Sequence, residues 1–574
     1  MSIVDPLPSD TLPQSCSVSM LIIFAVNACV LTVIELGISR DSSVALALRD
    51  PPGDSKKKKM AKPLTPTLRS IRDLCREIGW FSAVMGVAWL AEFHPVFPHS
   101  QKVWDRDLYW FLCLILMVFA FRDVKTLKEH QRDVLNREQS EEWKGWMQFM
   151  FLLYHYYKAE EVYNSIRVMI TCYVWMTGFG NFSFFYIKQD FGLVRVLQML
   201  WRLNFLVVVL CMVMGNTYVL YYICPLHTFF FLMVYVSMRI MPSLNHSQWG
   251  IKAKLLVLGV AIFIVWDLPG LCGFKFTFGA FLPTTPVIGA TGGTLWEWYF
   301  RTTLDHWSTY LGMIFALNFP MMQLWFTKVE ALPPARHILV KGVAAVLLSG
   351  VGLYWTYYYL SLPKLDYNQS NPYMAFVPLL VYVYLRNMTP WLRSVYLGPL
   401  HSIGKTTLET YLMQHHIWLT SNAKTLVTII PGYPKLNFVL ASILFVVLSQ
   451  ELYRLTMTLR GMLMPDDKKR CVTNLGIIGA TLFGSWAVAT IIVAASTGER
   501  ETFKEGNFTF MLTVVVVGLT IGVLAWIKRA VSTSSRVTSG DSSGHDSDQE
   551  QSVKLLSGGG GDGGSAGTAA ELLP

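Results

Sequence analysis

Long apolar segments recur from one end of the 574-residue chain to the other, and they limit its possible folds more than any other feature. A helix needs about 20 predominantly apolar residues to cross the hydrocarbon core of a bilayer. Hydrophobic residues make up 53% of the chain and charged residues only 15%, whereas about a quarter of a typical soluble protein is charged. The sequence therefore predicts an all-α, polytopic transmembrane helical bundle with roughly 10–15 spans or re-entrant helices.

The chain divides into four regions. Residues 1–100 hold N-terminal membrane segments with a basic loop at Lys56–Lys59, and residues 101–470 hold a larger membrane domain. Residues 471–527 are expected to form a C-terminal transmembrane hairpin. Residues 528–574 are rich in Ser, Gly and Asp and poor in aromatic side chains, so they cannot bury enough apolar surface to fold. We expect this last region to be a disordered cytosolic tail.

Basic residues lie in loops between the apolar segments and not in one patch. Loops rich in Lys and Arg face the cytosol, and such loops alternate with poorer ones along this chain. The segment before Met20 has no Lys or Arg, so the N-terminus is expected in the lumen and the C-terminus in the cytosol. Topology thus accounts for the net charge of +10, and no nucleic-acid partner is expected. The sequon at Asn368 then falls in a lumenal loop.

The nine cysteines form no CxxC pair, so we expect neither a metal site nor a disulfide framework.

Polar residues accumulate within an apolar background between Trp143 and Phe205. Each ionisable group at mid-membrane depth costs about 2.5–3.5 kcal/mol on insertion scales, so a chain that accumulates such groups usually needs them. His155 is one candidate, although a His in an aromatic belt at the membrane interface is an equally good interpretation. Gly178–Asn181 interrupts an apolar helix. Its small residues indicate close helix packing or a locally unwound helix that lines a cavity, and both can hold.

A second group of polar residues is Glu297, Arg301, Asp305 and His306. The first three are four residues apart and share one face of a helix, so they could form an ordinary ladder of ion pairs. The same face would equally make a polar wall for a sugar.

The segment Gly404–Leu419 carries a third group. Gly404-Lys405-Thr406 resembles the end of a phosphate-binding loop, but the first glycine of that motif is absent and no strand precedes it, so nucleotide hydrolysis is rejected. Glu409 and His416 are seven residues apart and share a helix face, whereas His415 is turned about a third of a turn away. A Glu–His pair in a membrane helix could act as an acid/base device.

Several of these segments closely resemble the plant REDUCED WALL ACETYLATION proteins. The resemblance covers roughly residues 100–470 and is carried by EEWKGWMQ at 141–148, YHY at 154–156, WMTGFGNFS at 175–183, WRLNF at 201–205, YICPLHT at 222–228, GKTTLETY at 404–411 and HIWL at 416–419. The wider family includes fungal capsule O-acetyltransferases and the membrane part of animal sialate O-acetyltransferase. The plant pattern has one His before Ile-Trp-Leu, where this chain has His415 and His416, and it lacks a His at the position of His306.

The resemblance implies a Golgi multi-spanning acyltransferase that takes acetyl groups from acetyl-CoA towards lumenal glycans. Fungal and animal relatives carry an additional lumenal serine-esterase-like domain, for which this chain has no room. A separate lumenal O-acetyltransferase of that type is therefore an expected partner, beside membrane lipid, acetyl-CoA and the glycan acceptor.

This chemistry assigns expected roles to the candidates. His155 and His416 would remove a hydroxyl proton or carry the acetyl group, Glu409 would orient His416, and Asn181 or nearby backbone N–H groups would stabilise the oxyanion. The anionic donor should meet cytosolic cations, for which the candidates are Lys188, Arg195, Arg202 and Lys405. The expected acceptor-binding residues are Glu160, Arg167, Glu297, Arg301, Asp305 and His306.

Two other classes of function remain open at this stage. Buried polar groups and helix breaks fit a transporter that moves acetyl-CoA or acetyl groups across the membrane equally well. A non-catalytic scaffold for lumenal glycosyl enzymes is the third class, and in it the buried charges would only pair with each other.

Overall fold

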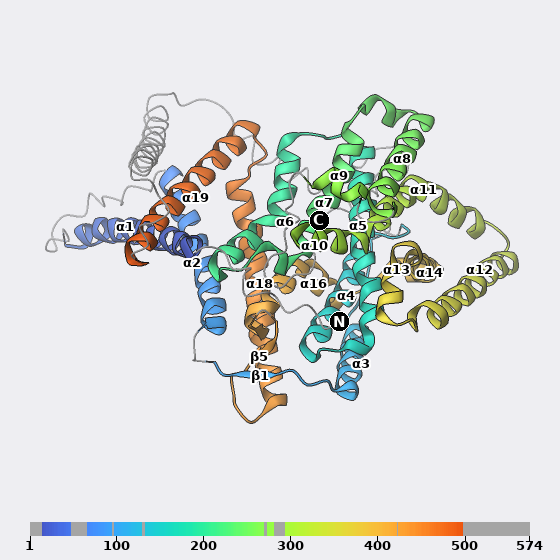
Figure 1. Ribbon diagram of the computed structural model, residues 1–574, viewed down its shortest axis with the longest axis horizontal. Helices are drawn as coiled ribbons and strands as arrows, with labels where there is room; N and C mark the ends of the chain where they lie inside the picture. Colours follow the sequence, from blue (N-terminus) through green and yellow to red (C-terminus); the bar gives the residue numbers. More distant parts are fainter. Residues whose placement is uncertain are drawn as a thin grey trace, which may run out of the picture.

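The computed structural model describes residues 14–47, 66–93, 97–128, 133–268, 272–279, 293–421 and 423–497, and these residues are mainly helical (Figure 1). The loop at Lys56–Lys59, the second half of the predicted C-terminal hairpin and the predicted tail lie outside the described residues. The α-helices are α1 (Gln14–Ala47), α2 (Pro66–Phe93), α3 (Arg106–Arg122), α4 (Arg137–Tyr157), α5 (Tyr163–Lys188), α6 (Leu193–Met214), α7 (Ile223–Arg239), α8 (Gln248–Ile262), α9 (Cys272–Phe278), α10 (Gly293–Thr303), α11 (His306–Glu330), α12 (Pro334–Trp355), α13 (Lys364–Met374), α14 (Phe376–Asn387), α15 (Pro390–Ser394), α16 (Gly398–Lys405), α17 (Thr407–Met413), α18 (Pro434–Leu463) and α19 (Lys468–Thr497).

Short elements connect these helices. The 3₁₀ turns are η2 (Glu160–Val162), η3 (Tyr218–Tyr221) and η4 (Pro242–His246), and the π-helical turns are η5 (Phe263–Asp267), η6 (Thr356–Leu360) and η7 (Gln414–Trp418). The strands are β1 (His99–Gln101), β2 (Val124–Thr126), β3 (Val395–Leu397), β4 (Leu419–Thr420) and β5 (Thr425–Val427). They form two small antiparallel sheets, with strand orders β1-β5-β4 and β2-β3.

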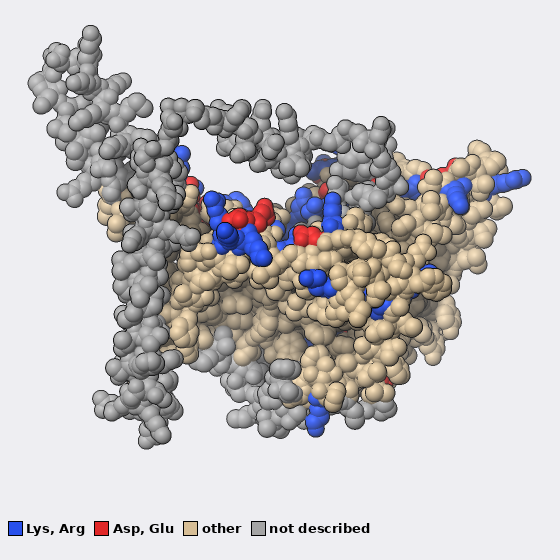
Figure 2. All heavy atoms as spheres, turned by 90° about the horizontal axis from the view of Figure 1, so that it is seen from above, with Lys and Arg blue, Asp and Glu red and all other residues tan. Residues whose placement is uncertain are grey.

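Eight helices among the described residues are long and apolar enough to cross a membrane, and two shorter apolar helices accompany them. The stretch Pro334–Leu360, which includes α12, buries only 11% of its most apolar window inside the protein. Most of the surface visible in Figure 2 carries no charge, and the charged side chains gather in a few groups. Such a surface suits contact with lipid.

The loops fall at two ends of the bundle. At one end β2 pairs with β3, Glu330 pairs with Arg393, and the amide of Gln198 donates to the carbonyl of Met464 at 3.1 Å. These contacts join loops rich in Lys and Arg, and we call this end the basic face. At the other end, which we call the opposite face, β1 pairs with β5.

Small residues allow α5 and α11 to pack closely. A Cβ at Gly178 would lie 2.1 Å from the carbonyl oxygen of Thr309, and one at Gly312 would lie 2.3 Å from that of Trp175. Helix α5 is continuous through Gly178–Asn181, so close packing is the correct interpretation of this motif and local unwinding is wrong. Asn181 is buried, and one N–H of its amide donates to the carbonyl of Thr177 at 2.8 Å.

Gly404 has a similar packing role between α16 and α4. A Cβ there would lie 1.8 Å from the carbonyl oxygen of Glu141, and one at Gly145 would lie 1.7 Å from that of Leu400. The glycine of the motif that resembles a phosphate-binding loop is thus explained by two helices in contact.

The sequon at Asn368 does not lie in an exposed loop. Asn368 is buried within α13, and its amide oxygen accepts a hydrogen bond from the hydroxyl of Tyr163 at 3.0 Å. Because glycosylation requires a surface asparagine, the expected accessible position is wrong.

The largest apolar cluster joins α2, α4, α6, α17 and α18 through residues such as Met85, Leu153, Leu210, Leu412 and Leu452. The π-helical turn η7 lies inside this cluster, since Trp418 stacks on Phe445 of α18 with ring centroids 5.4 Å apart. The core therefore holds the segment that carries His415 and His416 rigidly in place.

Candidate active site

Helix α17 widens into the π-helical turn η7 at Gln414, and all five residues of η7 are buried. A π-helical turn is uncommon and often occurs at functional sites, because it re-aims side chains that a regular α-helix would place elsewhere. Here it aims two consecutive histidines into the protein interior.

His416 is fully buried and lies between a carboxylate and a phenol. Its Nδ1 is 3.5 Å from Oε2 of Glu92 near the end of α2, and its Nε2 is hydrogen-bonded to the hydroxyl of Tyr221 in η3. In the tautomer with its proton on Nδ1, toward the carboxylate, the lone pair of Nε2 would accept the hydrogen bond from Tyr221. In this arrangement Nε2 of His416 is within hydrogen-bonding distance of a hydroxyl group, as a base that deprotonates a hydroxyl must be.

His155 and Gln414 supply unpaired polar atoms beside this pair. Nδ1 of His155 and both polar atoms of the Gln414 amide are buried, and none makes a well-aligned hydrogen bond in the part of the chain that the structure describes, although the His155 ring and the Gln414 amide lie near each other. A buried polar group without a partner costs about 1–3 kcal/mol, so three such atoms indicate a place for a ligand or water.

His415 joins the two histidines into one cluster. Its ring centroid lies 6.3 Å from that of His155 and 6.3 Å from that of His416. Unlike His416, it is held by its own helix, because its Nδ1 donates to the carbonyl of Tyr411 at 3.0 Å.

Lys102 lies where the cluster approaches the opposite face. Its Nζ donates to the carbonyl of His155 at 2.7 Å. Burial, with a smaller effect of the neighbouring Lys158, lowers the pKa of Lys102 to about 8. The side chain therefore carries a positive charge at neutral pH that is lost in mildly alkaline solution.

A complete ion pair lies on the other side of His416. The guanidinium of Arg202 contacts both carboxylate oxygens of Glu409, with Nη2 at 3.0 Å from Oε2. The hydroxyl of Thr456 donates to Oε1 of Glu409 at 2.9 Å, and Glu409 is fully buried. The charges and hydrogen-bonding groups of this pair are thus mutually satisfied.

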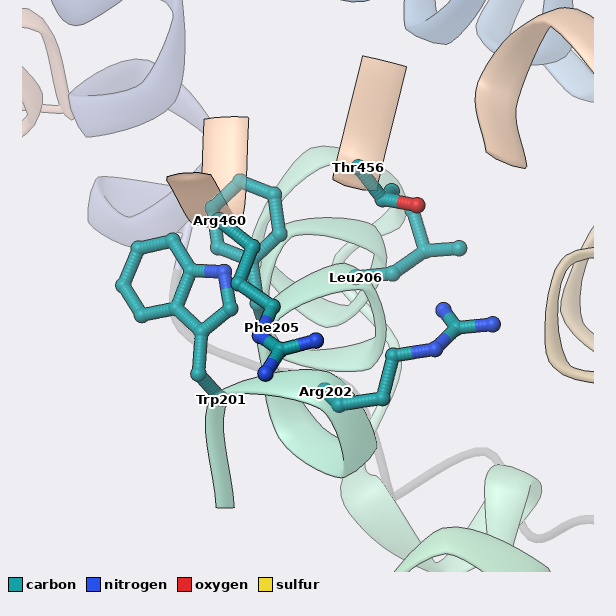
Figure 3. A pocket seen from close by; sticks show the side chains of 6 residues that line it. All are labelled: Trp201, Arg202, Phe205, Leu206, Thr456 and Arg460. Atoms are coloured by element: carbon teal, nitrogen blue, oxygen red, sulfur yellow. The ribbon is translucent and has the colours of Figure 1, made fainter. Parts of the chain in front are cut away.

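A small pocket lies next to this ion pair (Figure 3). Its lining residues are Trp201, Arg202, Phe205, Leu206, Thr456 and Arg460. Trp201 stacks on Phe205 with ring centroids 4.4 Å apart. Arg460 lies in the last turn of α18, close to the basic face.

These groups follow one course through the bundle. Arg460 shares a pocket with Arg202, and Arg202 pairs with Glu409. His416 follows Glu409 by seven residues in the same helical segment. At about 1.5 Å per residue, those seven residues cover roughly 10 Å. His155 and Lys102 continue the course to the opposite face, and we call this series the polar column.

The sequence of residues 4–476 matches the family described as "10 TM Acyl Transferase domain found in Cas1p". The chain belongs to this acyltransferase family. It is also 32% identical to the N-acetylneuraminate (7)9-O-acetyltransferase of Danio rerio over 419 residues, which is 71% of this chain and 52% of that protein. The chain thus spans about half the length of this relative. No solved structure matches the chain significantly.

Membership of the acyltransferase family confirms the resemblance that the sequence showed, and with it the polytopic helical fold. The contacts of two predicted site residues differ from expectation. Glu409 does not orient His416, because Arg202 and Thr456 take up its carboxylate. For the same reason Arg202 is not a free cation for the donor.

The predicted ladder Glu297–Arg301–Asp305 is interrupted. Glu297 and Arg301 do pair, at 2.8 Å, but α10 ends at Thr303. Asp305 lies beyond this helix end and pairs with the buried Arg167 of α5. Arg301 instead lies over the ring of Tyr222, at 4.2 Å from its centroid.

His306 is engaged through both ring nitrogens. Nδ1 is 2.6 Å from the carbonyl oxygen of Thr303, and Nε2 is 3.0 Å from Oδ1 of Asp267. Asp267 also accepts hydrogen bonds from Trp307, at 3.0 Å, and from Tyr373. Both ring nitrogens thus lie within hydrogen-bonding distance of protein groups, so His306 is held in a fixed orientation away from His416.

Three further predicted residues lie away from the buried cluster. Glu160 is exposed and pairs with Lys158 at 3.7 Å, while Lys188 and Lys405 are exposed at the basic face. Among the described residues no three His, Cys, Asp or Glu side chains are grouped closely enough to hold a metal ion.

Sequence reasoning missed Glu92, Tyr221 and Gln414. Tyr221 is directly before the YICPLHT motif and Gln414 is within two residues of His416. Both therefore lie beside sequence motifs that had been identified, although neither was selected. Glu92 ends an apolar segment with Phe93 and His94, and no spacing rule connects it with His416.

Proposed function

We propose that this protein is a membrane O-acetyltransferase that moves the acetyl group of acetyl-CoA to a hydroxyl group of a glycan in the Golgi lumen. The observation that carries the proposal is the position of His416, with Glu92 at Nδ1 and the hydroxyl of Tyr221 at Nε2. Acyl transfer to a hydroxyl group needs a base at this position. Acyl transfer is also what the family description names.

In the proposed reaction, the acceptor hydroxyl replaces that of Tyr221 at Nε2 of His416. The imidazole takes the hydroxyl proton while the oxygen attacks the thioester carbonyl. The carbon–sulfur bond then breaks, and the imidazolium returns the proton to the leaving thiolate, so that free CoA and the acetyl ester result. The carboxylate of Glu92 stabilises the imidazolium in between.

His155 and Gln414 are proposed to hold the acceptor. Their three unpaired buried atoms include both hydrogen-bond donors and acceptors, as a sugar with several hydroxyl groups requires. They lie at the end of the polar column that leads to Lys102 and the opposite face. Under the positive-inside rule the basic face meets the cytosol, so donor and acceptor would arrive from opposite sides.

The acceptor class is drawn from two comparisons. The relative in Danio rerio is named for acetylation of N-acetylneuraminate, and the plant proteins that the sequence resembles act on cell-wall glycans. Both acceptors carry sugar hydroxyl groups, and we therefore propose a glycan without choosing between the two sugars.

The test uses the purified full chain in nanodiscs with labelled acetyl-CoA and two acceptors, a sialylated oligosaccharide and a neutral cell-wall oligosaccharide. His416→Gln should lower the rate of acetyl transfer by about 10²–10⁴-fold, as expected for loss of a general base. The matched control is His415→Gln, because that neighbouring histidine is equally buried but tied to its own helix. Equal rates in the two variants would contradict the assignment.

The same preparation distinguishes the alternative function. In sealed vesicles a transporter would accumulate label without forming an acetylated sugar. Acetylation by the purified chain alone would show that no separate lumenal O-acetyltransferase is needed, whereas a trapped acetyl group on His416 would replace the direct transfer by a two-step reaction.

A further inference from the structure

We propose that the pocket at the basic face binds the phosphate groups of the acyl donor, with Arg460 as its cation, Arg195 as a second positive charge nearby and Trp201 as a further hydrogen-bond donor. The inference rests on the proposed function, because that function supplies a phosphate-bearing thioester as the donor.

The charge of the pocket comes from Arg460 and not from Arg202. The charge of Arg202 is balanced by Glu409. No acidic side chain in the described part of the chain forms an ion pair with Arg460, and its electrostatic neighbour is Arg195, a second cation. Asp190 is the nearby acidic group that attracts Arg195, and it is exposed. Arg195 does not line the pocket, because its guanidinium lies over the ring of Phe184 at 4.4 Å from the centroid. It adds a second positive charge near Arg460, and such a concentration of positive charge attracts a multivalent anion.

Trp201 provides a second, independent feature of the pocket. Its Nε1 is buried and has no hydrogen-bond partner among the described residues. The ring cannot turn freely, because it is stacked on Phe205 at an interplanar angle of 10°. Figure 3 shows the nitrogen-bearing edge of the indole turned toward Arg460. One N–H donor and a guanidinium thus face the same small space.

The position of the pocket fits a donor that extends inward. Arg460 lies near the end of α18 at the basic face, and the pair of Arg202 with Glu409 lies next to it on the side of the protein interior. Beyond this pair the same helical segment leads to His416. A ligand with its phosphates at Arg460 would direct its thioester arm along the polar column towards the base.

The test measures binding of CoA, and of pantetheine, which lacks all phosphates, to the full chain in nanodiscs of zwitterionic lipid. Arg460→Gln and Arg195→Gln should each weaken CoA binding by about 10–100-fold and leave pantetheine binding unchanged. Trp201→Phe, which removes the N–H and keeps a stacked ring, should weaken CoA binding by about 3–10-fold. Lys468→Gln is the matched control, since it removes an exposed cation of the same face, and it should have no effect.

A second arm separates the donor from a lipid headgroup, which offers the same phosphate chemistry. Nanodiscs that contain an anionic phosphoinositide should not compete with CoA for the pocket. Two results together would assign the pocket to lipid and overturn the proposal. The phosphoinositide would compete with CoA in the original protein but not in Arg460→Gln, and CoA would bind only weakly even in nanodiscs without phosphoinositide.

Failure of this inference and failure of the proposed function give different results. If Arg460→Gln transfers acetyl groups with an unchanged KM for acetyl-CoA, the phosphate site is wrong and the function stands. If CoA binding depends on Arg460 but no glycan is acetylated, the phosphate site stands and the function is wrong.

Discussion

The two halves of the segment Thr407–Trp418 contain buried polar groups of opposite kinds. In the α-helical half, Glu409 is satisfied by Arg202 and Thr456. In the π-helical half, the amide of Gln414 is buried without a well-aligned hydrogen bond among the described residues, and His416 lies between Tyr221 and Glu92, two groups that can exchange a proton with it. Both halves thus share burial, and they differ in how completely their buried polar groups are paired.

The difference has an energetic meaning. A complete ion pair fixes two helices, and removal of one partner leaves an uncompensated charge in the interior. A polar group without a partner has already lost its hydration, so its removal leaves no new charge or orphaned partner behind. Substitutions in the first half should thus affect folding, and those in the second half should affect transfer.

The largest effect is expected for Glu409→Ala. Arg202 would remain buried without its carboxylate, and the free energy of unfolding should fall by about 3–5 kcal/mol. Thermal unfolding of the protein in detergent measures this loss. Glu160→Ala serves as the control, because the Glu160 side chain is exposed.

A double variant sharpens this prediction. Replacement of the pair by Arg202→Met with Glu409→Leu should restore most of the lost stability, since buried ion pairs are often replaced by apolar groups without loss. If Glu409→Ala is as stable as Glu160→Ala, the interior pair is not what holds α6 to α17.

A smaller effect, on transfer, is expected for Glu92→Gln. The amide keeps the shape of the side chain but cannot stabilise an imidazolium on His416 by charge, so kcat should fall by about 10–100-fold, the size of effect that partners of metal-bound histidines also show. KM for both substrates should stay near its original value. Steady-state kinetics separate these terms, and a change in KM alone would mean that Glu92 holds a substrate.

The sequence predicted the membrane bundle, the basic loops and the choice of His416 over its neighbour as a candidate. It could not predict the partner of His416. Glu409 shares a face with His416 at 3.6 residues per turn, but the helix widens at Gln414, and this changes the angular position of every later side chain. Glu92 and Tyr221 come from distant parts of the chain, and only the fold brings them together.

Predictions for the other groups of polar residues failed for the same reason, because they assumed one regular helix. Helical spacing placed Asp305 with Arg301, but the helix ends at Thr303 and Asp305 pairs with Arg167. A glycine such as Gly178 is equally suited to close packing and to unwinding. The backbone of α11 next to Gly178 shows that close packing is the correct interpretation. Spacing rules are reliable within one regular helix and fail where the helix ends or changes its pitch.

The smallest effect is expected for Gln414→Leu, and it separates the two halves of the segment most directly. Leucine is close to glutamine in size and removes both unpaired polar atoms, so the melting temperature should stay the same or rise. One neutral hydrogen bond contributes about 0.5–1.5 kcal/mol, so KM for the glycan should increase by roughly 2–10-fold while KM for acetyl-CoA is unchanged. A loss of stability like that of Glu409→Ala would show that Gln414 supports the fold, and the proposed contrast between the two halves would then be wrong.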